Sequence, residues 1–241
     1  MNYYYITGTS RGIGKALALL LLQNENNYVI GLSRTKTIEH QRYEHFNFDL
    51  SSFEQVETYT FIDILDAQKV VLVNNAGVIG DVKHTGNINN KQIHKTFMVN
   101  TISPAVLMNN FVKAYGNLNI DKLIVNISSG AGRHAIESWS SYCASKSALD
   151  MFSSVVDNEQ KQINQSNPVK VFSVAPGIVD TQMQDEIREA DEADFSNVGT
   201  FVSFKSENQL DAPEKTAELL MKIIENPQKY KEVLLDVREI A

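Results

Sequence analysis

Cysteine is almost missing from this chain of 241 residues, which has Cys143 alone and so cannot form an internal disulfide. Such cysteine usage is typical of a reducing compartment, and we expect a cytoplasmic protein. The first ten residues, MNYYYITGTS, lack the basic segment and following apolar run of a signal peptide. No apolar run approaches the roughly 20 residues needed to span a bilayer. The sequence therefore predicts no membrane association.

Positive charge is scarce as well. The chain has 22 Lys and Arg against 29 Asp and Glu, a net charge of −7. Nucleic-acid-binding proteins normally carry a basic stripe, so we expect no nucleic-acid partner. The five histidines show no metal-ligand spacing, and we therefore predict no metal site.

Short apolar runs alternate with helical stretches along the whole chain. Strands are expected near residues 3–7, 28–33, 45–48, 69–74, 122–127, 169–174 and 232–237. Helices are expected after the first strand and over residues 52–67, 90–115, 140–161 and 214–225. Strands that alternate with helices form a doubly wound parallel sheet. We therefore predict the α/β class and one Rossmann-fold domain of about seven strands, with no linker that divides it.

The first strand runs directly into TGTSRGIG, which places Gly8, Gly12 and Gly14 between a strand and a helix. Glycines at such a turn let the backbone approach a ligand closely, and the helix N-terminus attracts an anion. Although the spacing differs from the commoner G-x-G-x-x-G, the strand–turn–helix context predicts a dinucleotide site.

The residues after the second strand bear on the choice of cofactor. A site that prefers NAD would place an Asp or Glu there to bind the ribose hydroxyls, but this chain has Ser33, Arg34, Thr35 and Lys36. Arg34, together with Arg11 in the glycine turn, can bind a 2′-phosphate. We therefore predict NADPH; the alternative is that both arginines are only surface residues.

Tyr142 and Lys146 are four residues apart, so on a helix they share one face. A phenol has an ordinary pKa of about 10. A neighbouring ammonium lowers that pKa, which suits acid–base work on an alcohol or carbonyl. A serine at the end of the preceding strand can bind the same oxygen. By itself, however, a Tyr-x-x-x-Lys pair is common on protein surfaces. The apolar side of this helix is expected to contain Ala144, Ala148, Met151, Phe152 and Val155.

Several polar or small-residue turns follow the candidate strands, at Asn74–Gly77, Ser128–Ser129 and Ala175–Gly177. In a parallel sheet these turns lie along one edge, where ligands bind. Residues 182–212 form a polar insertion with six carboxylates between Asp185 and Asp194. It is either a solvated helix or a mobile cover over the pocket, and we expect a substrate lid.

Taken together, these features resemble the short-chain dehydrogenase/reductase family over essentially the whole chain. The resemblance implies that Tyr142 is the general acid and that Lys146 lowers its pKa and binds the nicotinamide ribose. Ser129 would polarise the carbonyl, and Asn100 would hold a water in a proton relay. Ser129 is preferred to Ser128 because it lies thirteen residues before the tyrosine and because adjacent strand residues point to opposite faces.

The same resemblance implies the cofactor contacts. Asp49 would meet the adenine amine, Asn75 and Gly77 would line the adenosine side, and Ile178 and Thr181 would contact the carboxamide. The implied cofactor-binding residues are Gly8, Ser10, Arg11, Gly12, Ile13, Gly14, Arg34, Asp49, Leu50, Asn75, Ala76, Gly77, Tyr142, Lys146, Pro176, Gly177, Ile178 and Thr181.

Within the family, the stretch WSSYCASKSALDMF and the ending LLDVREI look similar to sepiapterin reductases and bacterial benzil reductases. This implies an NADPH-dependent carbonyl reductase that acts on a small ketone or diketone. Trp139, Met183 and Asp236 are the implied substrate residues, although Trp139 can equally be a hydrophobic plug. The alternatives are a non-catalytic NADP-binding sensor and a 3-oxoacyl-carrier-protein reductase. The resemblance also implies a homodimer formed through helices that include the one with Tyr142.

Overall fold

A computed structural model describes residues 1–64 and 66–240. Its centre is a seven-stranded, fully parallel sheet with the strand order β3-β2-β1-β4-β5-β6-β7. The strands are β1 (Asn2–Thr7), β2 (Asn27–Ser33), β3 (Tyr43–Asn47), β4 (Lys69–Asn74), β5 (Asp121–Ile127), β6 (Lys170–Ala175) and β7 (Leu234–Asp236). The predicted α/β class and Rossmann topology are confirmed.

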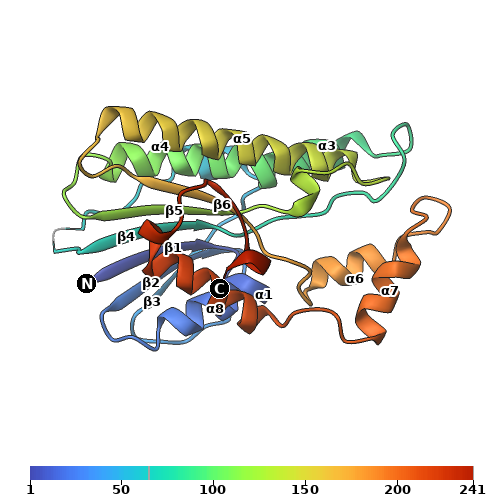
Figure 1. Ribbon diagram of the computed structural model, residues 1–241, viewed down its shortest axis with the longest axis horizontal. Coiled ribbons are helices and arrows are strands. Elements are labelled where there is room, and N and C mark those ends of the chain that lie inside the picture. The colour runs from blue at the N-terminus through green and yellow to red at the C-terminus, as the bar shows by residue number, and fades with distance from the viewer. Residues whose placement is uncertain (65, 241) are drawn as a thin grey trace.

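Helices cover both faces of the sheet (Figure 1). They are α1 (Gly12–Leu21), α2 (Phe53–Glu57), α3 (Asn90–Phe97), α4 (Ser103–Tyr115), α5 (Ser140–Ile163), α6 (Gln182–Arg188), α7 (Val198–Ser206) and α8 (Pro213–Glu225). Helices α1 and α8 pack together on one face, and α4 and α5 lie on the other. None of the helices in the described ranges is both long and apolar enough to cross a membrane.

The alternation of side chains along each strand produces two separate cores. In β1, Tyr4 and Ile6 belong to the core under α1 and α8, whereas Tyr5 belongs to the core under α4 and α5. All three are at least 96% buried. Successive strand residues point to opposite faces, and a strand covered on both faces must therefore be apolar throughout.

The expected helix over residues 90–115 is present, but it changes geometry partway. α3 passes into a π-helical turn (Met98–Ile102) and then into α4, which carries Pro104 in its first turn. A π-turn adds a residue to a helix and is frequent at functional sites. Here it contains Asn100, the amide that was singled out from the sequence.

The expected helix over residues 52–67 is wrong over most of its length. Among the described residues of this stretch, which do not include residue 65, only those of α2 are helical, and the first turn of α2 is capped by the Ser52 side chain. The aromatic residues that follow pack into the core instead: the ring centroid of Tyr59 lies 5.2 Å from that of Phe48, and Phe61 lies 4.8 Å from Tyr5. Edge-to-face aromatic packing outweighs the weak helix propensity of this segment.

The expected apolar side of α5 does not face the sheet. It points outward. Met151 is 66% exposed, Val155 47% and Phe152 39%. The side that faces the sheet is largely polar and contains Tyr142, Ser145, Lys146, Leu149, Asp150, Ser153, Asp157 and Gln160. Much of this polarity is satisfied locally; for example, Asn126 of β5 donates a hydrogen bond of 2.8 Å to Ser153.

Candidate active site

A cleft of about 1150 Å³ lies at the carboxyl ends of the strands. Helices α6 and α7 extend beyond the sheet at this edge (Figure 1). Predicted site residues that line the cleft are Gly8, Ser10, Arg11, Gly12, Ile13, Arg34, Asp49, Leu50, Asn75, Ala76, Gly77, Ser129, Trp139, Tyr142, Lys146, Pro176, Gly177, Ile178, Thr181, Met183 and Asp236. Of the predicted set, Gly14 and Asn100 are not part of the lining.

The glycine turn forms the floor of the cleft beside β1. Gly8 and Gly12 have φ angles of +76° and +58°, a backbone conformation that side chains other than glycine rarely adopt. Helix α1 starts at Gly12, and the side chain of its N-cap residue, Arg11, makes no capping hydrogen bond. The helix therefore presents backbone N–H groups and the positive end of its dipole, which suits a phosphate group.

Gly14 is required for packing rather than for ligand contact. A Cβ atom on Gly14 would lie 2.3 Å from Nδ2 of Asn75 and 2.5 Å from the carbonyl oxygen of Gly8. The Asn75 amide donates to the carbonyl of Thr7 at 2.9 Å. Asn75 thereby joins the ends of β1 and β4, and glycine is needed for the close approach of α1 to this junction.

Two arginines lie beside β1 and β2, at the end of the cleft that is farther from Tyr142. Arg11 and Arg34 are exposed, and neither forms an ion pair within the ranges that the structure describes. Burial acts to raise the pKa of Asp49, but hydrogen bonds from Ser51 and the charges of Arg34 and Lys95 lower it overall. Asp49 therefore carries a negative charge at neutral pH.

Tyr142 and Ser129 meet at the other end. Tyr142 is 94% buried, and Ser129 is the side chain whose hydrogen bonding acts to lower the pKa of the Tyr142 hydroxyl. Ser129 also accepts a hydrogen bond of 3.2 Å from the backbone N–H of Ala131. The hydroxyl of Ser128 is buried and has no partner among the described residues. Ser129 lines the cleft, and its choice over Ser128 stays a prediction.

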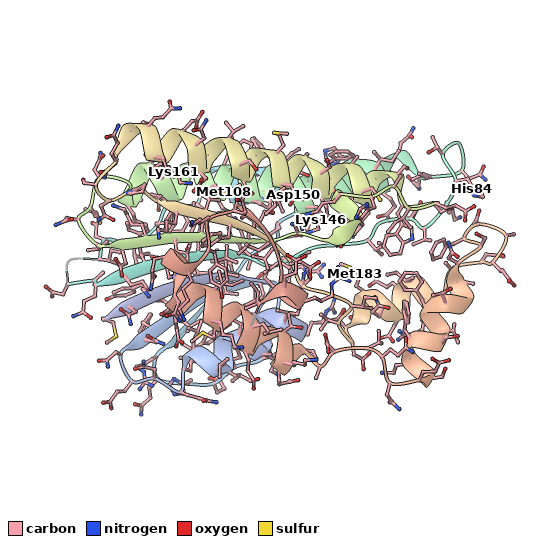
Figure 2. The ribbon with its side chains drawn as sticks, in the orientation of Figure 1. His84, Met108, Lys146, Asp150, Lys161 and Met183 are labelled. Carbon is pink, nitrogen blue, oxygen red and sulfur yellow. The ribbon has the colours of Figure 1, made fainter. Side chains whose placement is uncertain are left out.

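Lys146 lies on the next turn of α5 (Figure 2) and lines the cleft. Its Nζ donates to the carbonyl of Ile127 at 2.7 Å and lies 5.9 Å from the centroid of the Tyr142 ring. Gly77 leaves room beside it, since a Cβ there would lie 3.4 Å from this Nζ. The ammonium therefore faces both the ring and the turn after β4.

The expected lowering of the tyrosine pKa is not what the structure shows. Burial raises the pKa of Tyr142 to about 12, and the hydrogen bond from Ser129 only partly offsets this. Burial likewise lowers the pKa of Lys146 to about 8, against the opposing charge of Asp150. Desolvation penalises the charged form of each group and is the largest cause of both pKa shifts. At neutral pH the phenol is therefore protonated and can donate a proton.

Asn100 lies behind Lys146 rather than in the cleft. Its Oδ1 accepts from the backbone N–H of Val78 at 2.9 Å, and its Nδ2 donates to the carbonyl of Val78 at 2.8 Å and to Ser145 at 3.0 Å. These bonds attach the π-turn to the loop after β4 and to α5. The relay role stays a prediction.

Trp139 joins α5 to the insertion of residues 182–212. It is 94% buried, and its ring centroid lies 5.7 Å from both Tyr142 and Phe195 and 5.5 Å from Phe201. Met183 belongs to the same cluster. The insertion therefore packs an aromatic wall against the Tyr142 end of the cleft. Most of its acidic side chains are exposed, and Asp185 and Glu186 also line the cleft.

Asp236 also reaches the cleft, but its carboxylate is already engaged. Arg238 donates to it through Nε at 2.9 Å and through Nη2 at 2.5 Å, and the backbone N–H of Arg238 adds a third bond of 2.9 Å. These bonds lower the pKa of Asp236. Any ligand that binds this carboxylate has to compete with the guanidinium.

Arg238, Lys95 and Phe201 line the cleft and were not predicted. Arg238 stands two residues after Asp236, and this proximity was the one signal that pointed to it. Lys95 and Phe201 lie on α3 and α7, and no local motif marks either of them. Among the described residues, no group of three or more His, Cys, Asp or Glu side chains could hold a metal ion.

A doubly wound parallel sheet with a glycine turn at the start of α1 and a buried Tyr–Lys pair at the same edge is the architecture of a dinucleotide-dependent oxidoreductase. A family model for short chain dehydrogenases matches residues 2–192. The chain therefore belongs to the short-chain dehydrogenase family of oxidoreductases, which use nicotinamide cofactors.

Individual relatives show which reductases within the family this chain is similar to. A benzil reductase ((S)-benzoin forming) of Bacillus cereus is 34% identical, with 95% of this chain and 96% of that protein covered. A sepiapterin reductase of Xenopus tropicalis is 31% identical over 74% of each chain. The crystal structure of a short chain dehydrogenase/reductase from Saccharomyces cerevisiae has a TM-score of 0.86 at 26% identity, covering 99% of this chain and 97% of that one. The suspected resemblance to both reductase groups is confirmed.

Proposed function

We propose that this protein is an NADPH-dependent carbonyl reductase that acts on a small ketone or vicinal diketone. The observation that carries the proposal is the buried side chain of Tyr142, which lines the cleft together with Ser129 and has Nζ of Lys146 5.9 Å from its ring centroid. A phenol with a raised pKa remains protonated at neutral pH. It can donate its proton to an oxygen on which negative charge develops.

The residues around the glycine turn fit a dinucleotide. Gly8 and Gly12 leave the backbone open, α1 offers its N-terminus, and Arg11 and Arg34 are available for a 2′-phosphate. When bound, the cofactor supplies a hydride to the carbonyl carbon. We assign Asp49 to the adenine end and Ile178 and Thr181, after β6, to the nicotinamide end.

The chain itself supplies orientation and the proton. Ser129 donates a hydrogen bond to the carbonyl oxygen and so polarises it, and Tyr142 donates the proton that completes the alcohol. Lys146 holds a positive charge next to the phenol, which favours release of the proton. Residues 182–212 act as a lid that excludes water while this takes place.

The substrate is proposed to carry at least one aryl ring. Trp139, Phe201 and Met183 give the donor end of the cleft an aromatic and thioether wall, which suits a flat apolar group. Benzil has two flat apolar phenyl rings, whereas sepiapterin has a flat but polar pterin ring, and reductases named for each are similar to this chain. Arg238 already pairs with Asp236, so a pterin that binds this carboxylate would have to compete with the guanidinium. We therefore favour a benzil-like diketone over a pterin.

Purified protein mixed with NADPH and benzil is expected to oxidise the cofactor, which is followed by the loss of its absorbance. The same assay with sepiapterin and with simple aldehydes should give a lower kcat/KM, because those substrates fill the aromatic wall less well or compete with Arg238. Cofactor binding without oxidation by any of these carbonyls would instead support a non-catalytic NADP-binding sensor.

We also propose that the protein is a cytoplasmic homodimer formed through the outward side of α5. Met151, Phe152 and Val155 give this side an exposed apolar surface that a partner copy would cover. The double substitution Met151→Glu with Phe152→Glu should convert the dimer to a monomer in light scattering. Leu19→Glu, at a 46% exposed position of α1 on the opposite face of the sheet, is the control and should leave the mass unchanged. A wild-type protein that is monomeric at all concentrations would refute the proposal.

A further inference from the structure

Glu137 is a carboxylate that joins two separate loops next to the cleft. It stands two residues before Trp139, in the loop that leads into α5. One carboxylate oxygen, Oε2, accepts hydrogen bonds from the hydroxyl of Ser196 at 2.5 Å and from the backbone N–H of Ser196 at 3.3 Å. The other oxygen, Oε1, lies 3.0 Å from Nε2 of His84. Neither the proposed mechanism nor the cofactor assignment uses this group.

The two loops that Glu137 joins come from distant parts of the chain. His84 belongs to the loop between β4 and α3, and Ser196 belongs to the insertion, between α6 and α7. Figure 2 labels His84 at the end of the molecule where α6 and α7 extend beyond the sheet. The carboxylate therefore attaches the insertion to the body of the protein.

The two residues that follow this glutamate hold the same part of the insertion. The Ser138 hydroxyl donates to the backbone carbonyl of Asp194, and the Trp139 ring packs on Phe195, with 5.7 Å between the ring centroids. Phe195 is fully buried. Three consecutive residues before α5 thus bind three consecutive residues of the insertion, 194–196.

The backbone of Ser138 is shaped by this contact. Its φ angle is +64°, in a region that residues other than glycine rarely adopt. Such a conformation costs free energy and persists only where surrounding contacts require it. The contacts here are the hydroxyl bond to Asp194 and a hydrogen bond of 3.1 Å from the backbone N–H of Lys83 to the Ser138 carbonyl. The conformation of the loop before α5 is therefore coupled to its contact with the insertion.

Near its two ends, the insertion is attached by backbone hydrogen bonds. The N–H of Asp180 donates to the carbonyl of Asp211 at 2.9 Å, and the N–H of Asp211 donates to the carbonyl of Ile178 at 2.9 Å. Lys205 of α7 adds an ion pair with Asp180 at 2.5 Å. Residues 194–196 are held mainly by side chains of the loop before α5. This is therefore the attachment that can separate while the two ends stay in place.

The exposure of the Glu137 contact limits its strength. The side chains of Glu137 and His84 are 40% and 48% exposed, and an ion pair between exposed groups contributes little to stability. The hydrogen bonds from Ser196 each add a modest net amount. Such a contact shifts the balance between an attached and a detached insertion by a moderate factor, which suits a cover that opens in every catalytic cycle.

We propose that Glu137 is the latch of the substrate lid: it holds residues 194–196 against the start of α5 and so keeps the ring of Trp139 covered. The proposal rests on the reductase function and the lid proposed above. Without the latch, the insertion is detached for a larger fraction of the time, and a substrate binds less tightly to the aromatic wall. Because Tyr142 lies on α5 itself, the chemical step is unchanged once the substrate is bound and the lid is closed.

The first test measures detachment of the insertion and needs no substrate. Trp139 is the only tryptophan of the chain, so its quenching by acrylamide reports how far the insertion covers it. Glu137→Ala is expected to raise the Stern–Volmer constant severalfold. Glu207→Ala is the matched control and should leave the constant unchanged. Glu207 is an exposed carboxylate of the same insertion, and among the described residues its side chain accepts a hydrogen bond only from Gln209, at 2.8 Å.

The second test is kinetic, with NADPH and benzil. Glu137→Ala should raise KM for benzil by about 3- to 10-fold, the factor that corresponds to one or two hydrogen bonds of modest net strength. The value of kcat should change little, because a saturating substrate itself holds the lid closed. Ser196→Ala should also raise KM, and its addition to Glu137→Ala should have little further effect, since both substitutions break the same contact. Glu137→Gln keeps an acceptor for Ser196 and should restore most of the wild-type KM.

Quenching also distinguishes failure of this proposal from failure of the reductase function. An unmoved Stern–Volmer constant in Glu137→Ala would overturn the proposal, whatever the effect on KM. A lower melting temperature with unchanged quenching and KM would likewise overturn it and leave Glu137 a structural anchor of its own loop. Increased quenching in a protein that reduces no carbonyl would support the latch while it refutes the reductase.

Discussion

The Tyr142→Phe variant is expected to lose nearly all turnover while it still binds NADPH. The substitution removes one oxygen from a side chain that is 94% buried and packs edge-to-face on Trp139, so the fold has little reason to change. It also removes the proton donor. General acid catalysis contributes about 10²- to 10⁴-fold, and kcat should fall by about that factor.

The measurements for this variant are kcat with benzil and the quenching of protein fluorescence by NADPH. Tyr115→Phe is the matched control, because Tyr115 is also a buried tyrosine and its hydroxyl bonds Tyr5 and the carbonyl of Ile62 far from the cleft. The control should lose stability, by about 1 kcal/mol for its hydrogen bonds, but keep its turnover. Turnover of Tyr142→Phe close to that of the wild type would disprove the acid assignment.

The raised pKa of Tyr142 also bears on the direction of the reaction. A phenol with a pKa of about 12 is protonated throughout the neutral range, which is the form needed to reduce a carbonyl. Oxidation of an alcohol needs the phenolate, which this environment disfavours. In the proposed mechanism this protonation state suits the reduction step at neutral pH, and Lys146 contributes its positive charge up to its own pKa of about 8.

The fold could be predicted from the sequence because strands such as β4 and β5 are apolar throughout and alternate with helices. The orientation of α5 could not. Amphipathic patterning assumes that the apolar side of a helix faces the core. In α5 the buried side is polar because it contains Tyr142, Lys146 and Asp150 and satisfies them internally, so its apolar residues face outward.

The candidate site also has features that the sequence could predict and features that it could not. The glycine turn and the Tyr142–Lys146 pair are local patterns, and both are visible in the sequence. Lys95 and Phe201 belong to segments that the chain brings to the cleft from far away, so only the tertiary structure identifies them. The raised pKa of Tyr142 was missed for a related reason: the i,i+4 spacing reveals the neighbouring ammonium but not the extent of burial.

The second large effect is expected at Arg34, in the choice between cofactors. Arg34 follows β2, is exposed, and forms no ion pair within the described residues, so its guanidinium is available to a ligand. No carboxylate stands at the end of β2 to bind ribose hydroxyls or repel a phosphate. Hydrogen bonds to charged groups contribute about 1.5–3 kcal/mol, which corresponds to roughly 10- to 150-fold in affinity.

Arg34→Ala should therefore reduce the ratio of kcat/KM for NADPH to that for NADH by about 10- to 100-fold, mainly by weakening NADPH. The kcat/KM values for NADPH and for NADH are both measured with the same carbonyl substrate at a saturating concentration. Lys36→Ala is the matched control, since Lys36 is a nearby exposed cation that pairs with Glu39 at 2.7 Å. A general loss of positive charge would affect both variants, whereas a specific 2′-phosphate contact affects Arg34→Ala alone. An unchanged ratio in Arg34→Ala would show that the cofactor preference, if any, has another source, with Arg11 the next residue to replace.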